Sequence, residues 1–269
     1  MCGRFTLTSP IDEVGEYFRV LEGGWPQAAE RPARYNIAPT QPVACVRQPA
    51  AGGREIVEMR WGLVPYWADD PAIGNRMINA RAETLAKRSA YKEPFRRRRC
   101  LVVADGFYEW RKLPGGKQPY YVYMADKKPF GFAGLWDRWR PRGGSLEGLG
   151  DPERAAEQLS ADGRLESCAI VTGEPNELLE PIHDRMPVIV APEHWDAWLD
   201  PELDEPEPLQ EILRTYPAVL MRAHPVSTHV NKPANDDPEC IRPLAKLKIK
   251  RPDEAPETSE PPSPQRELF

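Results

Sequence analysis

The architecture is most evident in residues 100–136, which read CLVVADGFYEWRKLPGGKQPYYVYMADKKPFGFAGLW. Runs rich in Val, Phe, Tyr and Trp at 100–111, 119–125 and 130–136 predict β-strands. Pro114-Gly115-Gly116 separates the first two runs, and this composition is typical of a hairpin tip. The region therefore predicts consecutive antiparallel strands.

Similar short apolar runs lie on both sides of this region. Further strands are predicted at 42–48, 55–65, 168–175 and 186–192, and helices at 11–22, 192–200 and 208–216. Helices and strands do not alternate in the regular βαβ order of a nucleotide-binding sheet. The pattern indicates an α+β fold with many antiparallel strands.

Two segments have the composition of unpacked chain. Residues 140–166 are rich in glycine and poor in large apolar groups, which predicts an inserted surface loop. Residues 251–269 are acidic and rich in proline, which predicts a disordered tail. A single domain over 2–245 accounts for the rest.

Composition excludes several classes of protein. The 269 residues contain no apolar run long enough to span a membrane, and the first ten lack the apolar segment of a secretory signal. Five scattered cysteines fit neither a disulfide scaffold nor a CxxC-type zinc site, so a cytoplasmic location is expected. The net charge of −5 divides into +5 over 1–112 and −10 over the remainder. The basic half permits phosphate contacts, although uneven surface charge alone accounts for it equally well.

Cys2 follows the initiator methionine. Removal of Met1 would leave an α-amine and a thiol on adjacent carbons. Such an aminothiol condenses with an aldehyde through an imine to a five-membered thiazolidine, and an α-amine with a pKa near 8 has a useful neutral fraction at pH 7. The thiol could instead act as an ordinary nucleophile, or the position could be an accident of the terminus.

Six motifs occur in order along the chain: CGRF at 2–5, RYNIAPTQ at 34–41, MRWGLVPYWA at 59–68, INARAET at 78–84, CLVVADGFYEW at 100–110 and IHDRMPVIV at 182–190. Together they resemble the SOS-response-associated peptidase (SRAP) family, proteins that shield abasic sites in DNA. The resemblance implies an α+β domain whose curled sheets form a barrel-like core, with a basic channel for single-stranded DNA. It also implies autocatalytic removal of Met1 and a DNA-damage response associated with the nucleoid.

The resemblance assigns four catalytic residues. Cys2 would be the covalent residue, and Glu109 the general acid and base, because its aromatic neighbours should raise the carboxyl pKa. His183 would donate to the opening sugar, and Asn79 would orient the amine or the sugar-phosphate. For Asn79 a simple turn role stays open.

DNA contacts are expected from a second group of residues. Arg4 and Arg81 are candidate phosphate ligands, with Arg185 a weaker third, because guanidinium geometry matches phosphate. Trp67, Pro39 and Trp110 are candidates to stack on bases or wedge between them, although a single Trp is more often part of a core. The run Arg96–Arg99 is equally well explained as solvated charge.

No metal or cofactor is expected, because the histidines form no HExxH or paired Cys/His pattern and no phosphate-binding glycine loop is present. The sequence thus predicts a monomer that binds abasic single-stranded DNA and crosslinks to it through Cys2, with lyase-like and autopeptidase activity. Two rival functions are a thiol peptidase acting on other proteins and a non-covalent single-strand reader.

Overall fold

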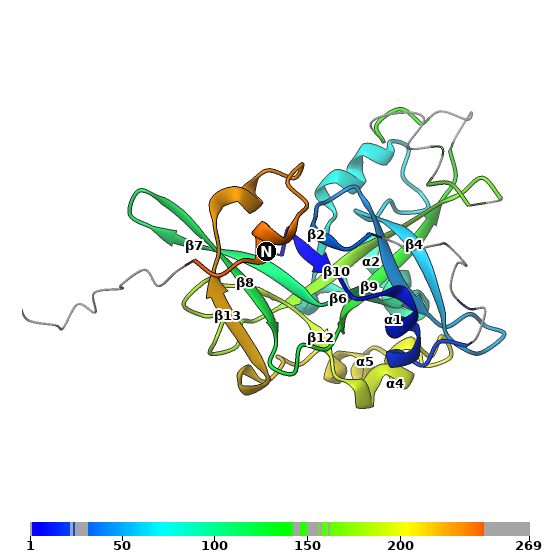
Figure 1. The fold of residues 1–269 in the computed structure, drawn as a ribbon. Coiled ribbons are helices and arrows are strands. Elements are labelled where there is room, and N and C mark those ends of the chain that lie inside the picture. The colour runs from blue at the N-terminus through cyan, green and yellow to red at the C-terminus, as the bar shows by residue number, and fades with distance from the viewer. Residues whose placement is uncertain are drawn as a thin grey trace, which may run out of the picture.

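The computed structural model describes residues 2–21, 24, 32–141, 146–149, 156, 158–160 and 162–244. Strands dominate, arranged in two sheets with a few short helices at the periphery (Figure 1). This arrangement confirms the predicted α+β class with a barrel-like, mostly antiparallel core.

A closed five-stranded barrel forms the centre of the molecule. Its strands follow the order β10-β4-β3-β6-β9, and the barrel closes because β9 also pairs with β10. Of the five strand pairings that close the barrel, only β10–β4 is parallel. The strands are β3 (Pro42–Arg47), β4 (Glu55–Trp61), β6 (Arg99–Ala104), β9 (Phe130–Trp139) and β10 (Leu165–Gly173). Three short strands extend it: β5 (Asn79–Arg81), β11 (Met186–Pro187) and β12 (Ile189–Val190).

Two glycines of β9 permit the close packing of this barrel. A Cβ at Gly134 would lie 2.7 Å from the Cys100 sulfur, and one at Gly131 would lie 2.8 Å from the Leu101 Cβ. Such distances are too short for carbon contacts, so neighbouring side chains occupy the space that larger residues on β9 would need.

The second sheet has the order β13-β8-β7-β1-β2. Its strands are β1 (Phe5–Leu7), β2 (Arg34–Ile37), β7 (Gly106–Leu113), β8 (Gly116–Met124) and β13 (Met221–Pro225). The β7–β8 pairing runs to Leu113 opposite Gly116, so the hairpin predicted at 114–116 is present. It projects from one side of the molecule (Figure 1).

The helices are short and lie outside the sheets. They are α1 (Ile11–Tyr17), α2 (Ser89–Arg97), α4 (Trp195–Leu199) and α5 (Pro206–Ile212). Helices α1, α4 and α5 fall within the predicted segments or overlap them, whereas α2 was not predicted. No helix in the described ranges has the length and apolar composition needed to cross a membrane.

The proposed insert 140–166 connects β9 to β10, which pair antiparallel from Trp139 opposite Leu165. Parts of it, and the whole proposed tail 251–269, lie outside the described residues. The last described segment, residues 226–244, follows β13 and is here called the C-terminal clasp. In Figure 1 the amino terminus lies beside this part of the chain.

Candidate functional site

Cys2 lies directly ahead of β1 and is fully buried. Its carbonyl oxygen accepts a hydrogen bond of 2.8 Å from Asn79 Nδ2, and its thiol donates to the Arg4 carbonyl at 3.7 Å. Burial raises the pKa of the thiol, and the charge of Glu109 raises it further. The thiol is therefore protonated at neutral pH and needs a base before it can attack as thiolate.

Asn79 stands on β5, which pairs in parallel with β10. Tyr91 donates its hydroxyl to the Asn79 carbonyl at 3.2 Å. The side-chain oxygen Oδ1 of Asn79 is buried and has no hydrogen-bond partner among the described residues. The amide thus holds Cys2 with its nitrogen and retains an acceptor for another donor.

Glu109 comes from β7, the strand beside β1. The two strands are antiparallel, with Phe5 opposite Phe107 and Thr6 opposite Gly106. Extending this register by two residues places Glu109 beside residue 3. Its side chain is 1% exposed. Burial raises the pKa of its carboxyl to about 7, opposed by the positive charge of the chain's α-amine. A group with this pKa can both take and release a proton at neutral pH.

His183 lies in the turn between β10 and β11. Its Nδ1 accepts a hydrogen bond from the Arg185 backbone N–H at 3.0 Å, and Asp184 Oδ1 lies 2.9 Å from the same nitrogen. Burial lowers the pKa of the imidazole, and the charge of the α-amine lowers it further. Both effects favour the uncharged ring at neutral pH.

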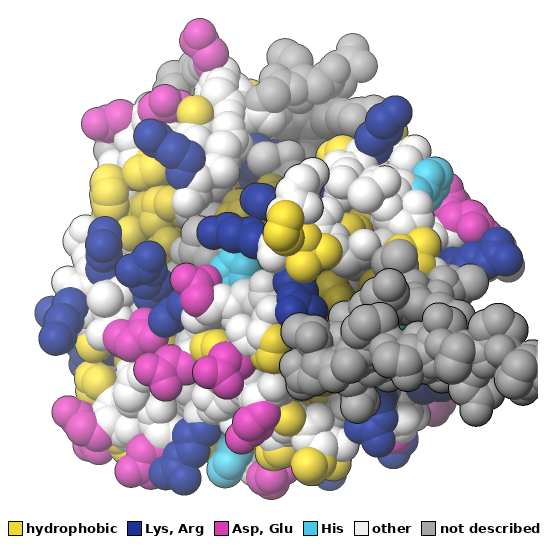
Figure 2. Space-filling view, turned by 90° about the vertical axis from the view of Figure 1, so that its left-hand side faces the viewer, with side chains coloured by type: hydrophobic (Ala, Val, Ile, Leu, Met, Phe, Trp, Pro, Cys, Tyr) yellow, Lys and Arg dark blue, Asp and Glu magenta, His cyan; other side chains and the backbone are white. Residues whose placement is uncertain are grey.

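These contacts bring the four predicted catalytic residues together. Asn79 bonds Cys2, the charge of Glu109 acts on the Cys2 thiol, and the α-amine acts on both Glu109 and His183. Figure 2 shows a histidine recessed in a hollow on this side of the molecule, with Lys and Arg side chains at its rim. Four separate chain segments therefore converge on the amino end.

The three predicted phosphate ligands differ in how they are held. Arg4 is half-buried, and its guanidinium donates to Asn36 Oδ1 at 2.7 Å and to the carbonyls of Val230 and Asn231 at 2.8 and 3.3 Å. Arg81 is exposed at the end of β5 and makes no side-chain hydrogen bond within the described ranges. Arg185 forms a bidentate ion pair with Glu83. Of the three, Arg81 is the most available to a ligand.

The predicted aromatic and proline contacts are partly exposed. Trp67 is 41% exposed, and its neighbour Tyr66, which the sequence analysis did not single out, is 61% exposed. Pro39 and Trp110 are half-buried, and the Trp110 indole donates to Asn231 Oδ1 at 2.8 Å. Both Tyr66 and Trp67 are therefore accessible to a ligand.

The C-terminal clasp was not foreseen as part of the site. Asn36 Nδ2 donates to the clasp carbonyls of Val230, Lys232 and Asn235 at 2.7–3.1 Å. Asp236 accepts from the backbone N–H groups of residues 35 and 36 and from the Arg34 guanidinium. The motif RYNIAPTQ contains these residues, but their partners lie about 200 positions later.

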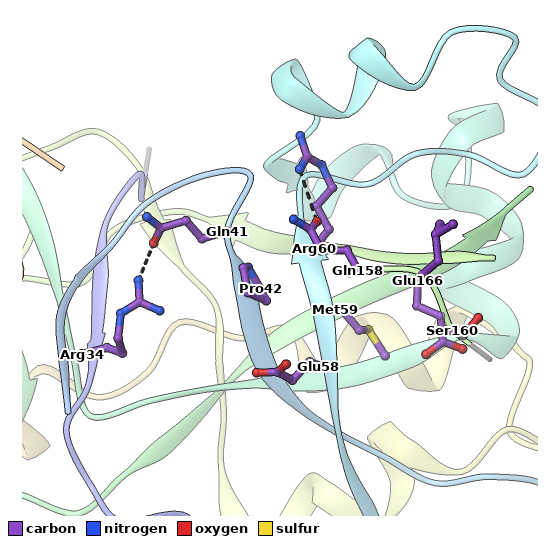
Figure 3. Close-up of a pocket in the computed structure, with 10 residues that line it drawn as sticks. Arg34, Gln41, Pro42, Glu58, Met59, Arg60, Gln158, Ser160 and Glu166 are labelled. Atoms are coloured by element: carbon purple, nitrogen blue, oxygen red, sulfur yellow. Dashed lines mark hydrogen bonds between the residues drawn. The ribbon is translucent and has the colours of Figure 1, made fainter. Parts of the chain in front are cut away.

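A separate hollow of about 530 Å³ lies on the outer side of β3 and β4 (Figure 3). Arg34 bonds Gln41 at one end, and Arg60 bonds Gln158 at the other. None of its lining residues is among those predicted from sequence to act in catalysis or DNA binding.

Three described residues could together hold a metal ion. His229, Asp237 and Cys240 of the clasp place one ligand atom each within 4.8 Å of one another. In the present arrangement, however, His229 Nε2 bonds Asp237 Oδ2 at 2.9 Å and the Cys240 thiol donates to the Asn235 carbonyl at 3.2 Å. Each side chain thus has a hydrogen-bond partner without an ion.

Comparison with known proteins places this geometry in context. The family model described as SOS response associated peptidase (SRAP) matches residues 1–233. The chain is 40% identical over 243 residues to the abasic site processing protein YoqW of Bacillus subtilis, covering 90% of this chain and 99% of that one. It is 35% identical over 214 residues to the abasic site processing protein HMCES of Gallus gallus, covering 71% and 58% of the respective chains.

Solved structures give the same picture of the fold. A protein from Bacteroides thetaiotaomicron superposes with a TM-score of 0.73 at 24% identity, covering 91% of this chain and all of that one. A phage-related protein from Bordetella bronchiseptica superposes with a TM-score of 0.58 at 29% identity, covering 84% and 94%.

Proposed function

Because this chain belongs to the SOS response associated peptidase family, we propose that it processes abasic sites in single-stranded DNA by forming a covalent thiazolidine through Cys2. The observation that carries the proposal is the environment of Cys2. Its buried thiol lies within the electrostatic reach of Glu109, and its backbone carbonyl is held by the Asn79 amide.

The proposed reaction begins after removal of Met1. The Cys2 amine adds to the aldehyde carbon of the opened abasic sugar, and loss of water gives an imine. The Cys2 sulfur then adds to the same carbon and its proton passes to the nitrogen, which closes the ring. Overall, an aldehyde and an aminothiol give a thiazolidine and one water molecule.

Glu109 is proposed to move the protons of this sequence. The ionised carboxylate takes a proton from the attacking amine or from the Cys2 thiol, whose raised pKa makes that help necessary. The protonated form returns a proton to the departing hydroxyl. Because its pKa is about 7, both forms are abundant at neutral pH.

His183 and Asn79 are proposed to act beside Glu109. A neutral His183 donates a hydrogen bond to the sugar oxygen as the ring opens. Asn79 fixes the Cys2 backbone, so that the amine and the thiol approach the aldehyde together.

DNA is proposed to lie across the face that bears Arg81 and Trp67. Arg81 would bind a backbone phosphate, and Trp67 with Pro39 would support or separate the bases beside the lesion. Three of the five N–H donors of Arg4 are engaged within the protein. Arg4 would therefore contribute mainly its positive charge and would hold the first strand in position.

Removal of Met1 is the second activity we propose. The Cys2 thiol, with His183 or Glu109 as proton carrier, would add to the Met1 carbonyl carbon and displace the Cys2 nitrogen as the free amine. Water would then hydrolyse the thioester, which releases methionine and restores the thiol. The thiol belongs to the residue that forms the Met1–Cys2 bond, so it can reach this bond without binding a separate substrate. This favours self-processing over the cleavage of other proteins.

Intact-mass measurement after mixing the protein with abasic single-stranded DNA tests the proposal. The expected product has the mass of protein without Met1 plus DNA, less one water, and survives heating. DNA binding without a covalent product would support the alternative that the protein binds single strands non-covalently. Cleavage of added proteins without an adduct would support the thiol peptidase.

A further inference from the structure

We propose that the Glu83–Arg185 ion pair is a positioning device that fixes His183 in the tautomer with its proton on Nε2. The inference rests on the proposed function for its catalytic consequence, but the tautomer itself can be measured without any reaction.

The ion pair joins two segments that each carry a site residue. Glu83 lies in the 3₁₀ helix η2 (Ala82–Thr84), directly after β5 with Asn79. Arg185 Nη1 lies 2.6 Å from Glu83 Oε1, and its Nη2 lies 3.1 Å from Oε2. A bidentate guanidinium–carboxylate pair fixes direction as well as distance. The turn that contains His183 is thereby tied to the strand that holds Cys2.

A second bond anchors the arginine on the barrel. Its Nη2 also donates to the Thr172 carbonyl of β10 at 2.6 Å. The Arg185 side chain is only 19% exposed, whereas that of Glu83 is 51% exposed. Three of the five guanidinium donors are thus used inside the protein, which favours a structural task over phosphate binding.

The backbone of Arg185 sets the tautomer of His183. Its N–H points at His183 Nδ1 at 3.0 Å, so that nitrogen must offer a lone pair. The neutral ring then carries its proton on Nε2. Asp184 Oδ1 lies 2.9 Å from Nδ1, but this side chain is 89% exposed and can turn into water, whereas the backbone N–H is fixed.

The other charges acting on the ring support the neutral form. The α-amine and Lys112 disfavour a second proton, and Asp184 favours it. Loss of the ion pair would leave Arg185 held, among the described residues, only by the Thr172 carbonyl and by the pairing of Met186 with Gly173, which loosens the N–H that holds Nδ1. The tautomers would then mix, and the donor aimed at the sugar would be lost in part of the molecules.

The test uses Glu83→Gln, with Glu180→Gln, an exposed glutamate of the same turn region, as control. Long-range ¹H–¹⁵N NMR of His183 should report the Nε2–H tautomer in the wild type and the control, and a mixture in Glu83→Gln. Crosslinking to abasic DNA should slow on the order of 10–100-fold, as expected from lost orientation. The affinity for undamaged single strands should not change.

Charge reversal separates positioning from phosphate binding. The double variant Glu83→Arg with Arg185→Glu should recover at least half of the lost rate, and Arg185→Lys provides a milder variant if the reversal fails to fold. An unchanged tautomer in Glu83→Gln would overturn the inference. So would a loss of DNA affinity and salt dependence in Arg185→Lys with no effect in Glu83→Gln. If the wild type forms no adduct, the proposed function fails while the NMR result still decides the tautomer.

Discussion

Glu109→Gln should slow crosslinking and at the same time stabilise the folded protein at alkaline pH. Burial raises the carboxyl pKa from its ordinary 4.5 to about 7. Since one pKa unit corresponds to about 1.36 kcal/mol, the ionised group costs the folded state about 3 kcal/mol. The glutamine removes that cost together with the ability to carry a proton.

The sign of the pH effect follows from proton uptake. Between pH 4.5 and 7 the folded protein binds more protons at this site than the unfolded chain, so wild-type stability falls as pH rises. The stability difference between Glu109→Gln and wild type should therefore grow by about 3 kcal/mol from pH 4 to pH 8. Urea denaturation at the two pH values measures it, with exposed Glu207→Gln as control.

Although Glu109→Gln should raise stability, it should lower the rate of crosslinking. Loss of acid–base catalysis typically lowers the reaction rate 10²–10⁴-fold. The crosslinking rates of wild type and Glu109→Gln should be compared on one synthetic abasic oligonucleotide between pH 6 and pH 8. Two results would refute the reasoning: unfolding curves whose difference stays constant with pH, or a variant with the wild-type rate and pH profile.

Three further variants test other parts of the site. Cys2→Ser should yield no heat-stable adduct by intact mass while it keeps most of its DNA affinity, and an adduct in normal yield would exclude the thiazolidine. Arg81→Ala should reduce the salt slope of single-strand binding by about one, measured by fluorescence anisotropy, whereas Arg242→Ala on the clasp surface should not. Asn36→Ala should lower the free energy of unfolding by about 1–3 kcal/mol, because it removes the hydrogen bonds of the buried Asn36 amide to the clasp and to Arg4. An unfolding midpoint equal to that of wild type would assign these bonds no net stability.

Local sequence patterns predicted all five barrel strands but not where each one ends. The run 100–111 is two strands, β6 and β7, because Asp105 interrupts it. Its carboxylate accepts hydrogen bonds from Thr6, Thr8 and Ser9, including 2.6 Å from the Thr8 backbone N–H. The break depends on residues about 100 positions away, which no local pattern can reveal.

Short or polar elements also escaped prediction. Helix α2 contains Pro94 and several charged residues, so its sequence lacks a clear helical signal. Its position is nevertheless fixed, because the buried Arg99 donates to the carbonyls of Phe95 and Trp198. Strands β1 and β2 have three and four residues, and such strands exist only through their neighbours.

The residues of the candidate site could be predicted, but the hydrogen bonds and ion pairs that connect them to the rest of the protein could not. Cys2 could be named from its own chemistry, whereas Asn79, Glu109 and His183 were named because their motifs resemble those of the SRAP family. The ion pair of Arg185 and the clasp bonds of Arg4 could not, because a guanidinium suits phosphate, carboxylate and carbonyl oxygens equally well. Only the folded arrangement decides among them.

The bonds between Arg4 and the clasp also set an order of events during synthesis. Residue 230 is added 226 positions after residue 4, which takes roughly 10–45 seconds at about 5–20 residues per second. Until then Arg4 lacks the clasp carbonyls that accept its hydrogen bonds, although β2 and β7 can already pair with the first strand. Translation that stops before residue 221 therefore releases chains whose second sheet lacks β13 and whose Arg4 guanidinium lacks its clasp partners.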